Sequence, residues 1–331
     1  MDDFPSFLLH GAVGLGIWNA LFAAASAMLC ERTSPTEILD PIDGNIRACG
    51  QCAACRLVRA GTHPDLMALA PEAMASELNL NFAEDAESAT SGEKRSPSKD
   101  ISIDAIRQLV DWAHGTSHRG GLKVALIYPL DAMAPPAANA LLKTLEEPSS
   151  NLYFLTGTHH LDRILPTLRS RCRLKPMPRL GQDEALRILQ ERGVADPKDV
   201  ANWCRNAVHG ADPDGGLDWV RNLLRVLITQ GKDDRHVDPI GTPPPLHIAI
   251  AALQKLNADM LRTQFGQRPM YLPTEAPAVA GLGRQAGAAR LQSFWQRLAE
   301  YSGTAHFPLH AGLTADALIL EFKQLFPRSA H

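Results

Sequence analysis

The feature that most constrains this chain is a short apolar run near its start, followed by closely spaced glycines and an alanine-rich segment. Residues 7–10 are Phe-Leu-Leu-His, the glycines lie between Gly11 and Gly16, and the residues from Asn19 to Leu29 are rich in Ala and Leu. A short apolar run beside glycine indicates a buried strand, and a longer segment of good helix formers indicates a helix. The pattern therefore predicts a strand, a glycine loop and a helix.

The alternation of strands and helices continues along the first half of the chain. We expect a helix around residues 103–110, a strand over 124–128, a helix over 137–147 that Pro148 stops, and a strand over 152–156. Strands that alternate with helices form a parallel sheet wrapped by helices. The sequence thus predicts an α/β core over residues 1–178.

The strand pattern ends at about residue 180, and the rest of the chain is predicted to be helical. We expect helices over 182–194, 217–230, 246–265, 291–302 and 313–326. Pro239 and the three prolines at 243–245 indicate a linker. Two helical domains are therefore predicted, over residues 179–238 and 239–331.

Charge and composition exclude several classes of protein. The chain has 33 Lys and Arg against 36 Asp and Glu, a formal charge of −3, so it does not coat nucleic acid by bulk charge. Seven acids and three bases fall within residues 72–100, which we predict to be a mobile surface insert. The apolar stretch over 20–29 is shorter than the roughly 20 residues that span a bilayer, and the start Met-Asp-Asp lacks a cationic signal. We expect a cytoplasmic protein with reduced cysteines.

The glycine loop has the spacing of a phosphate-binding loop but lacks its reactive groups. Such a loop reads G-x-x-x-x-G-K-[ST], in which Lys supplies charge and the hydroxyl holds Mg²⁺. Here Gly11 and Gly16 have the right interval, but Ile17 and Trp18 follow. The sequence therefore lacks both the cation and the metal-binding hydroxyl.

The second half of a nucleotide-hydrolysing site is also missing. An acidic pair normally closes the next core strand, where it holds Mg²⁺ and activates water. This chain has Tyr128 and Pro129 at that point. We expect no hydrolysis here. The glycines are interpreted as a strand-to-helix turn, while weak nucleotide binding by the amides around Gly11, Gly14 and Gly16 stays open.

Four cysteines have the spacing of a metal site. Cys49, Cys52 and Cys55 lie within seven residues, and Cys30 at the end of the preceding helix is a fourth candidate ligand. Four thiolates surround Zn²⁺ tetrahedrally and leave no position for water, which is typical of structural zinc. A ferredoxin-type cluster would need another Cys four positions after Cys55, where Arg59 stands, so zinc is favoured over iron–sulfur, with unligated cysteines as the alternative. The other two cysteines stand alone and are expected in the core: Cys172 and Cys204.

A basic stretch without acids is accompanied by distinctive sequence blocks. The stretch contains six bases, which are Arg163, Arg169, Arg171, Arg173, Lys175 and Arg179. Around it lie Asn-Ala-Leu-Leu-Lys-Thr-Leu-Glu-Glu-Pro over 139–148 and Leu-Pro-Thr-Leu-Arg-Ser-Arg-Cys over 165–172. With the cysteine module and Gly-Thr-His-Pro-Asp over 61–65, these blocks resemble the clamp-loader branch of the AAA+ family, specifically over residues 7–178.

The resemblance implies a subunit of the DNA polymerase III clamp loader, which uses ATP to place a sliding clamp on primed DNA. In this family the Ser170-Arg171-Cys172 motif faces a neighbour's ATP, which implies that Arg171 is an arginine finger acting in trans, with Ser170 beside it. Implied partners are clamp-loader subunits of gamma/tau and delta type. ATP would be bound by those partners, and zinc would be this chain's own cofactor.

The resemblance also names the expected domains, as a degraded AAA+ core with a zinc module, a helical lid and a helical collar that holds the complex together. The isolated chain is not expected to be an active ATPase, although it would be part of a DNA-directed DNA polymerase holoenzyme, a nucleotidyltransferase. Thr158 falls near the family's sensor position and is interpreted as a strand-end residue. Two alternatives remain, an active ATPase of gamma/tau type and a zinc-dependent nucleic-acid-binding protein.

Overall fold

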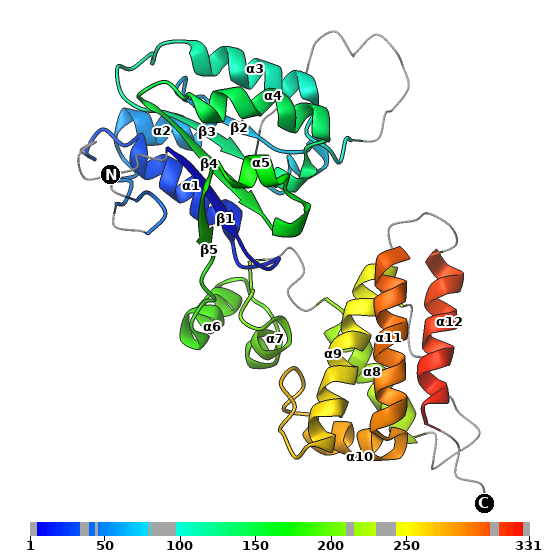
Figure 1. Cartoon of the computed structure of the whole chain (residues 1–331). Coiled ribbons are helices and arrows are strands. Elements are labelled where there is room, and N and C mark those ends of the chain that lie inside the picture. Colours follow the sequence, from blue (N-terminus) through cyan, green and yellow to red (C-terminus); the bar gives the residue numbers. More distant parts are fainter. Residues whose placement is uncertain are drawn as a thin grey trace, which may run out of the picture. The chain divides into compact units, whose positions relative to one another are not determined.

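The chain divides into two compact units, Met1–Arg179 and Leu180–His331 (Figure 1). The structure is a computed structural model, and it describes residues 5–33, 40–43, 46–78, 80, 97–209, 215–229, 243–304 and 311–326. Each unit is presented separately below. No helix within these ranges is long and apolar enough to cross a bilayer.

The first unit is built on one parallel sheet with the strand order β2-β3-β4-β1-β5. Its five strands are β1 (Ser6–His10), β2 (Leu66–Leu69), β3 (Lys123–Ile127), β4 (Leu152–Thr158) and β5 (Arg173–Pro176). Every residue of β3 is buried, as is typical of a strand covered on both faces. The predicted α/β class with a parallel sheet is confirmed.

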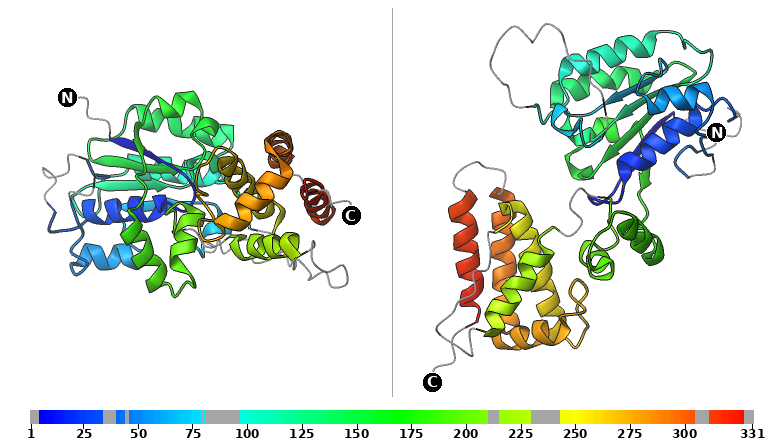
Figure 2. Two further views of the ribbon diagram at one scale, coloured as in Figure 1. Left: turned by 90° about the horizontal axis from the view of Figure 1, so that it is seen from below. Right: turned by 180° about the vertical axis from the view of Figure 1, so that it is seen from behind.

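Helices cover both faces of this sheet (Figure 2). They are α1 (Ile17–Met28), α2 (Ala53–Arg59), α3 (Ile103–His114), α4 (Pro135–Glu146) and the short α5 (Pro166–Arg169). Alternate strand residues point to opposite faces, so Leu126 joins the core beneath α1 while Ile127 joins the core beneath α3 and α4. Two hydrophobic layers therefore hold the sheet between the helices.

Helix α1 lies unusually close to β4. A Cβ built on Gly157 would stand 2.5 Å from Cγ2 of Ile17 and 2.8 Å from Cδ1 of Leu21. No side chain fits such a gap, so glycine is required there. This contact fixes the start of α1 against the carboxyl end of the sheet.

In the second unit, all the regular secondary structure among the described residues is helical. The helices are α6 (Gln182–Glu191), α7 (Pro197–Cys204), α8 (Leu217–Thr229), α9 (Leu246–Gln264), α10 (Ala276–Ala286), α11 (Ala288–Thr304) and α12 (Ala311–Gln324). One core includes residues from α6 through α12, with Trp203 of α7 fully buried. The buried carboxylate of Asp259 accepts the backbone amides of Met270, Tyr271 and Leu272, which orders the loop before α10.

The predicted insert over 72–100 lies mostly outside the described residues, since residue 79 and residues 81–96 are not described. Hydrogen bonds join the two ends of the insert, at residues 72–73 and at Ser98. The prediction of a mobile surface segment therefore does not hold for these ends. The amide of Ala73 donates to the carbonyl of Ser98 at 3.0 Å, and the amide of Ser98 donates to the carboxylate of Glu72 at 2.9 Å. The side chain of Leu78 is buried in the core beneath α1.

Candidate functional site

The glycine loop follows β1 at the carboxyl end of the sheet, as the sequence predicts. Gly14 and Gly16 have φ values of 84° and 83°, which L-residues with side chains rarely adopt. The amide of Gly11 donates to the carbonyl of Thr158, and the amide of Leu15 donates to the carbonyl of Ala12, both at 3.3 Å. Two amides of the loop are thus already used within the chain.

The residue at the lysine position faces the core. Ile17 is 1% exposed and packs beneath the sheet with Leu21 and Leu126. The position that carries charge in a functional phosphate loop is therefore an apolar core position here.

Two hydrogen bonds link the glycine loop to Tyr128 through His159. Nδ1 of His159 lies 2.9 Å from the carbonyl oxygen of Gly11, and Nε2 lies 2.6 Å from the hydroxyl of Tyr128. A carbonyl only accepts, so Nδ1 is the donor in the first bond, and in the tautomer with its proton on Nδ1 the other nitrogen, Nε2, accepts from the tyrosine hydroxyl. Burial, together with the charges of Glu77 and Asp131, raises the pKa of Tyr128 to about 12, which keeps that hydroxyl protonated.

Tyr128 stands where a hydrolysing site has its acidic residue, and the carboxylate of Asp131, three residues further on, is engaged in a hydrogen bond. The hydroxyl of Thr158 donates to Asp131 at 2.5 Å and accepts the amide of His160 at 3.0 Å. Thr158 is fully buried, in agreement with its interpretation as a strand-end residue. His159 is a residue that the sequence did not single out, and its only sequence signal is its place directly after a core strand.

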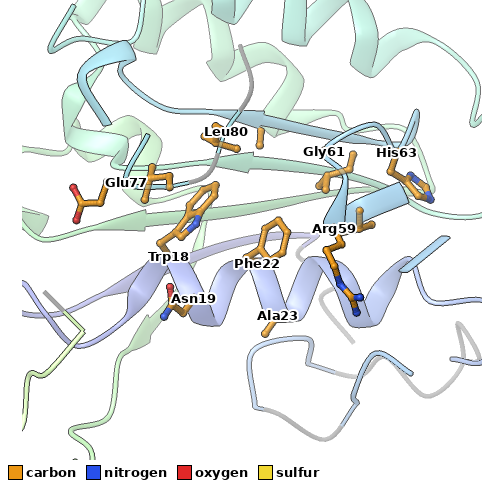
Figure 3. A pocket seen from close by; sticks show the side chains of 13 residues that line it. Trp18, Asn19, Phe22, Ala23, Arg59, Gly61, His63, Glu77 and Leu80 are labelled. Carbon is orange, nitrogen blue, oxygen red and sulfur yellow. The ribbon is translucent and has the colours of Figure 1, made fainter. Parts of the chain in front are cut away.

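Trp18 projects from α1 into a pocket (Figure 3). It lines this cavity of about 760 Å³ with Phe22, Leu80 and Glu77, and its ring packs against Tyr128 at a centroid distance of 5.8 Å with the ring planes tilted by 40°. The position that holds a Mg²⁺-binding hydroxyl in a functional loop therefore supports Tyr128 by packing.

The four predicted cysteines lie together. The candidate ligand atoms of Cys30, Cys49, Cys52 and Cys55 are all within 4.8 Å of one another, and the sulfurs of Cys49 and Cys55 are 3.9 Å apart. Sulfurs bound tetrahedrally to zinc at about 2.3 Å stand about 3.8 Å from each other. The cluster can therefore hold a metal ion.

Local backbone geometry builds this cluster. Cys52 caps the start of α2, where its sulfur accepts the amide of Cys55 at 3.4 Å. The sulfurs of Cys49 and Cys30 accept the amides of Cys52 and Cys49 at the same distance. Amides directed at sulfur favour the thiolate form, which is the form that binds metal.

The pKa shifts and the mutual repulsion of the four thiolates favour a bound cation. Hydrogen bonds from the amides of Gln51 and Cys52 lower the pKa of Cys49 to about 6, whereas burial raises the pKa of Cys55 to about 12. Four thiolates this close repel one another, and a divalent cation would remove that repulsion. The donor set, spacing and burial fit a structural metal ion bound by four thiolates.

The Gly-Thr-His-Pro-Asp motif has a structural role, in which Asp65 binds the turn over residues 117–119. The buried carboxylate of Asp65 accepts the amides of His118 and Arg119 at 2.7 and 3.0 Å and the hydroxyl of Ser117 at 3.1 Å. These bonds connect the start of β2 with the turn before β3. The motif therefore supports the sheet beside the cysteine cluster.

Arg171 follows α5 and lies at the amino end of the sheet. With Ser170 it lines a cavity of about 830 Å³, together with Pro5 just before β1 and Tyr153 at the start of β4. The loop at Gly11 follows the other end of β1. Five residues of strand separate these ends by about 16 Å. The structure thus separates Arg171 from this chain's own phosphate loop.

Arg171 contacts residues of α4 and α5. Its guanidinium pairs with the carboxylate of Glu146 and donates to the carbonyl of Thr167 at 2.7 Å. The hydroxyl of Ser170 donates to that same carbonyl at 3.0 Å and lies 3.5 Å from Nη1 of Arg171. Both motif residues are thereby attached to the end of α5.

The basic stretch is partly neutralised. Lys175 forms ion pairs with Asp40 at 2.6 Å and Asp43 at 3.0 Å, and Arg173 lies 3.5 Å from Asp40. Burial raises the pKa of Asp40, but the Lys175 hydrogen bond, the amide of Ile42 and the two cations outweigh it and lower the pKa overall. With Arg171 also paired, three of the six bases contact acids of the same chain.

Cys172 and Cys204 are not part of the cluster. Cys172 is buried beneath α3 and α4, where burial raises its pKa to about 12. Cys204 is half-buried against the core of the second unit. Both positions agree with the expected packing roles.

Comparison with known proteins identifies the family. The family model described as "DNA polymerase III, delta subunit" matches residues 4–180, over half of the chain's 331 residues. The chain belongs to this family. The sequence motifs resemble those of one member of the clamp-loader branch, the delta-prime subunit. The curated relatives confirm this resemblance.

Two of these relatives are named DNA polymerase III subunit delta'. The protein from Pseudomonas aeruginosa is 36% identical over 195 residues, which cover 59% of this chain and 49% of that protein. The protein from Escherichia coli K12 is 31% identical over 169 residues, which cover 51% of this chain and 41% of that protein. The chain thus matches less than half the length of each relative.

A solved structure of a gamma subunit-related protein from Thermotoga maritima is 17% identical and covers 76% of this chain and 88% of its own, with a TM-score of 0.37. At that score the structural likeness carries no argument. The assignment to the DNA polymerase III delta subunit family rests on the sequence.

Proposed function

We propose that this chain is a subunit of the DNA polymerase III clamp loader that acts on a neighbour's ATP without hydrolysing nucleotide itself. Its family and the names of its relatives support the first part. In that complex its partners are subunits of gamma/tau and delta type, and the complex places the sliding clamp on primed DNA.

The observation that carries the proposal is the position of Arg171. It lies at the amino end of the sheet, whereas the loop from Gly11 to Gly16 lies at the carboxyl end. An arginine so far from the chain's own loop can serve a nucleotide only if another subunit brings it. A guanidinium that meets a γ-phosphate stabilises the charge of the transition state, so Arg171 is an arginine finger in trans.

The carboxyl end of the sheet supports the absence of hydrolysis by this chain. Ile17 supplies no charge, and the hydrogen bonds from Tyr128 through His159 to the carbonyl of Gly11 occupy that end without a carboxylate. An active ATPase of gamma/tau type would need a cation and a free carboxylate among these groups. Tight Mg·ATP binding by the isolated chain would favour that alternative.

Zinc has a structural role in the proposal. Cys30, Cys49, Cys52 and Cys55 would hold it and keep the connection between α1 and α2 in place. Four thiolates leave no ligand position for water, so zinc supplies stability and no chemistry. Partial pairing of the basic stretch weighs against a zinc-dependent nucleic-acid-binding function.

The helical unit completes the proposed subunit. Residues 179–238 would form a lid and residues 239–331 a collar through which the subunits assemble. Deletion of residues 239–331 is expected to abolish co-purification with the other loader subunits.

The test of the finger is ATP turnover by the reconstituted loader containing Arg171→Ala. We expect clamp- and DNA-stimulated turnover to fall, by less than the roughly 10³–10⁵-fold effect of arginine fingers in GTPases, because this subunit serves one site of several and the other sites can still turn over. Arg169→Ala removes an exposed cation two residues away and should leave turnover unchanged. Unchanged turnover in the Arg171 variant would refute the proposal.

A further inference from the structure

The carboxylate that holds Arg171 is placed at an unfavourable end of its helix. Glu146 is the last residue of α4 and Glu147 follows it, although the carbonyls that end a helix favour cations and disfavour carboxylates. Two exposed acids at this position therefore gain nothing from the helix itself. The gain comes from the guanidinium of Arg171, which pairs with Glu146.

The guanidinium of Arg171 contacts one residue of α5, the helix that it follows, and one residue of α4. Nη1 donates to the carbonyl of Thr167, which belongs to the same short helix, α5, that Arg171 follows. Nη2 contacts Glu146, whose side chain is 45% exposed and lines the same open cavity. An anion entering this cavity meets an arginine that is already oriented but is paired with a carboxylate.

We propose that Glu146 is a positioning residue that acts as a latch on Arg171. In the free subunit Glu146 holds the guanidinium on the chain's own surface, and a neighbour's γ-phosphate displaces it on assembly. The exchange replaces one anion by another on Nη2, while Thr167 keeps Nη1 oriented. The proposal rests on the finger role of Arg171.

Glu146→Gln keeps the size of the side chain and removes the charge that competes with phosphate. Exposed ion pairs are weak, so release of Arg171 is expected to lower the apparent KM for ATP of the reconstituted loader by about two- to fivefold. Because the pair with Glu146 is already broken once ATP is bound, its removal changes the ground state and the transition state of the bound complex equally, and kcat should stay unchanged. A fall in kcat, or no change in KM, would overturn the latch.

Glu147→Gln is the matched control, because it removes the same charge from the same cavity while Arg171 keeps its pair with Glu146. An equal fall in KM in this variant would mean that general charge matters and would overturn the latch.

Combination with Arg171→Ala separates the latch from the finger. If the latch acts through Arg171, Glu146→Gln has no effect on KM in the Arg171→Ala background. A persisting effect of Glu146→Gln there would overturn the latch. Unchanged turnover in Arg171→Ala alone would overturn the finger, whereas a strong loss there with a neutral Glu146→Gln would overturn the latch alone.

Discussion

The hydrogen-bonded chain over the glycine loop predicts a measurable coupling between Tyr128 and His159. His159 donates to the carbonyl of Gly11 and accepts from the hydroxyl of Tyr128. A hydrogen bond contributes about 0.5–1.5 kcal/mol net, so His159→Ala, which loses both, is expected to lower the free energy of unfolding by about 1–3 kcal/mol.

Tyr128→Phe removes the shared bond and keeps the ring that packs against Trp18. Its expected cost is about 0.5–1.5 kcal/mol. The shared bond can be lost only once, so the double variant should cost less than the sum of the single variants, by about 0.5–1.5 kcal/mol.

Urea unfolding followed by circular dichroism measures all three variants, with His160→Ala as the control. His160 is exposed and contributes its backbone amide to the local hydrogen bonds, so its removal should change stability by less than about 0.5 kcal/mol. Strictly additive costs for Tyr128→Phe and His159→Ala would refute the hydrogen-bonded closure of the loop.

Three further predictions concern the supports of the first unit. Asp65→Ala leaves the hydroxyl of Ser117 and the amides of His118 and Arg119 without their acceptor and should lower the free energy of unfolding, measured in urea, by about 3 kcal/mol. A cost below about 1 kcal/mol would contradict the structural role of Asp65. The pKa of Asp40 is lowered in the folded chain, so its pairing stabilises the protein at neutral pH and is lost on acidification. Asp40→Asn should therefore destabilise the chain at pH 7, and this cost should shrink as the pH falls below 3.8, the ordinary pKa of an aspartate. A cost independent of pH would argue against the ion pair. The chain is expected to bind about one zinc ion, measured by mass spectrometry, and Cys52→Ser should lower that amount while Cys204→Ser should not. Equal metal content in the two variants would exclude the four-cysteine cluster as the zinc site.

The sequence predicted the features that depend on local spacing. The strand and helix around the glycine loop have the expected order, and the lost groups at Ile17 and Tyr128 are visible without a structure. The cysteine set was also predictable, because Cys49, Cys52 and Cys55 are close in the chain.

Features that depend on distant contacts could not be predicted. His159 reaches Gly11 across 148 residues, and Glu146 reaches Arg171 across 25. Neither pairing leaves a periodic pattern in the sequence.

Short elements were missed for a different reason. β2 and β5 have four residues each, too few to show alternation, and α2 and α7 are short helices. β5 carries Arg173 and Lys175, which we interpreted as part of a basic stretch. Their pairing with Asp40 became clear only when the cysteine-containing connection was seen beside β5.

The most direct test of the central claim is a structure of the assembled complex with ADP and beryllium fluoride, which mimics bound ATP. We predict that Arg171 lies within hydrogen-bond distance, about 2.7–2.9 Å, of the γ-phosphate mimic in a neighbouring subunit. The loop from Gly11 to Gly16 should hold no nucleotide and should still be closed by His159. An Arg171 that stays on Glu146 while every site of the complex is filled would contradict the claim.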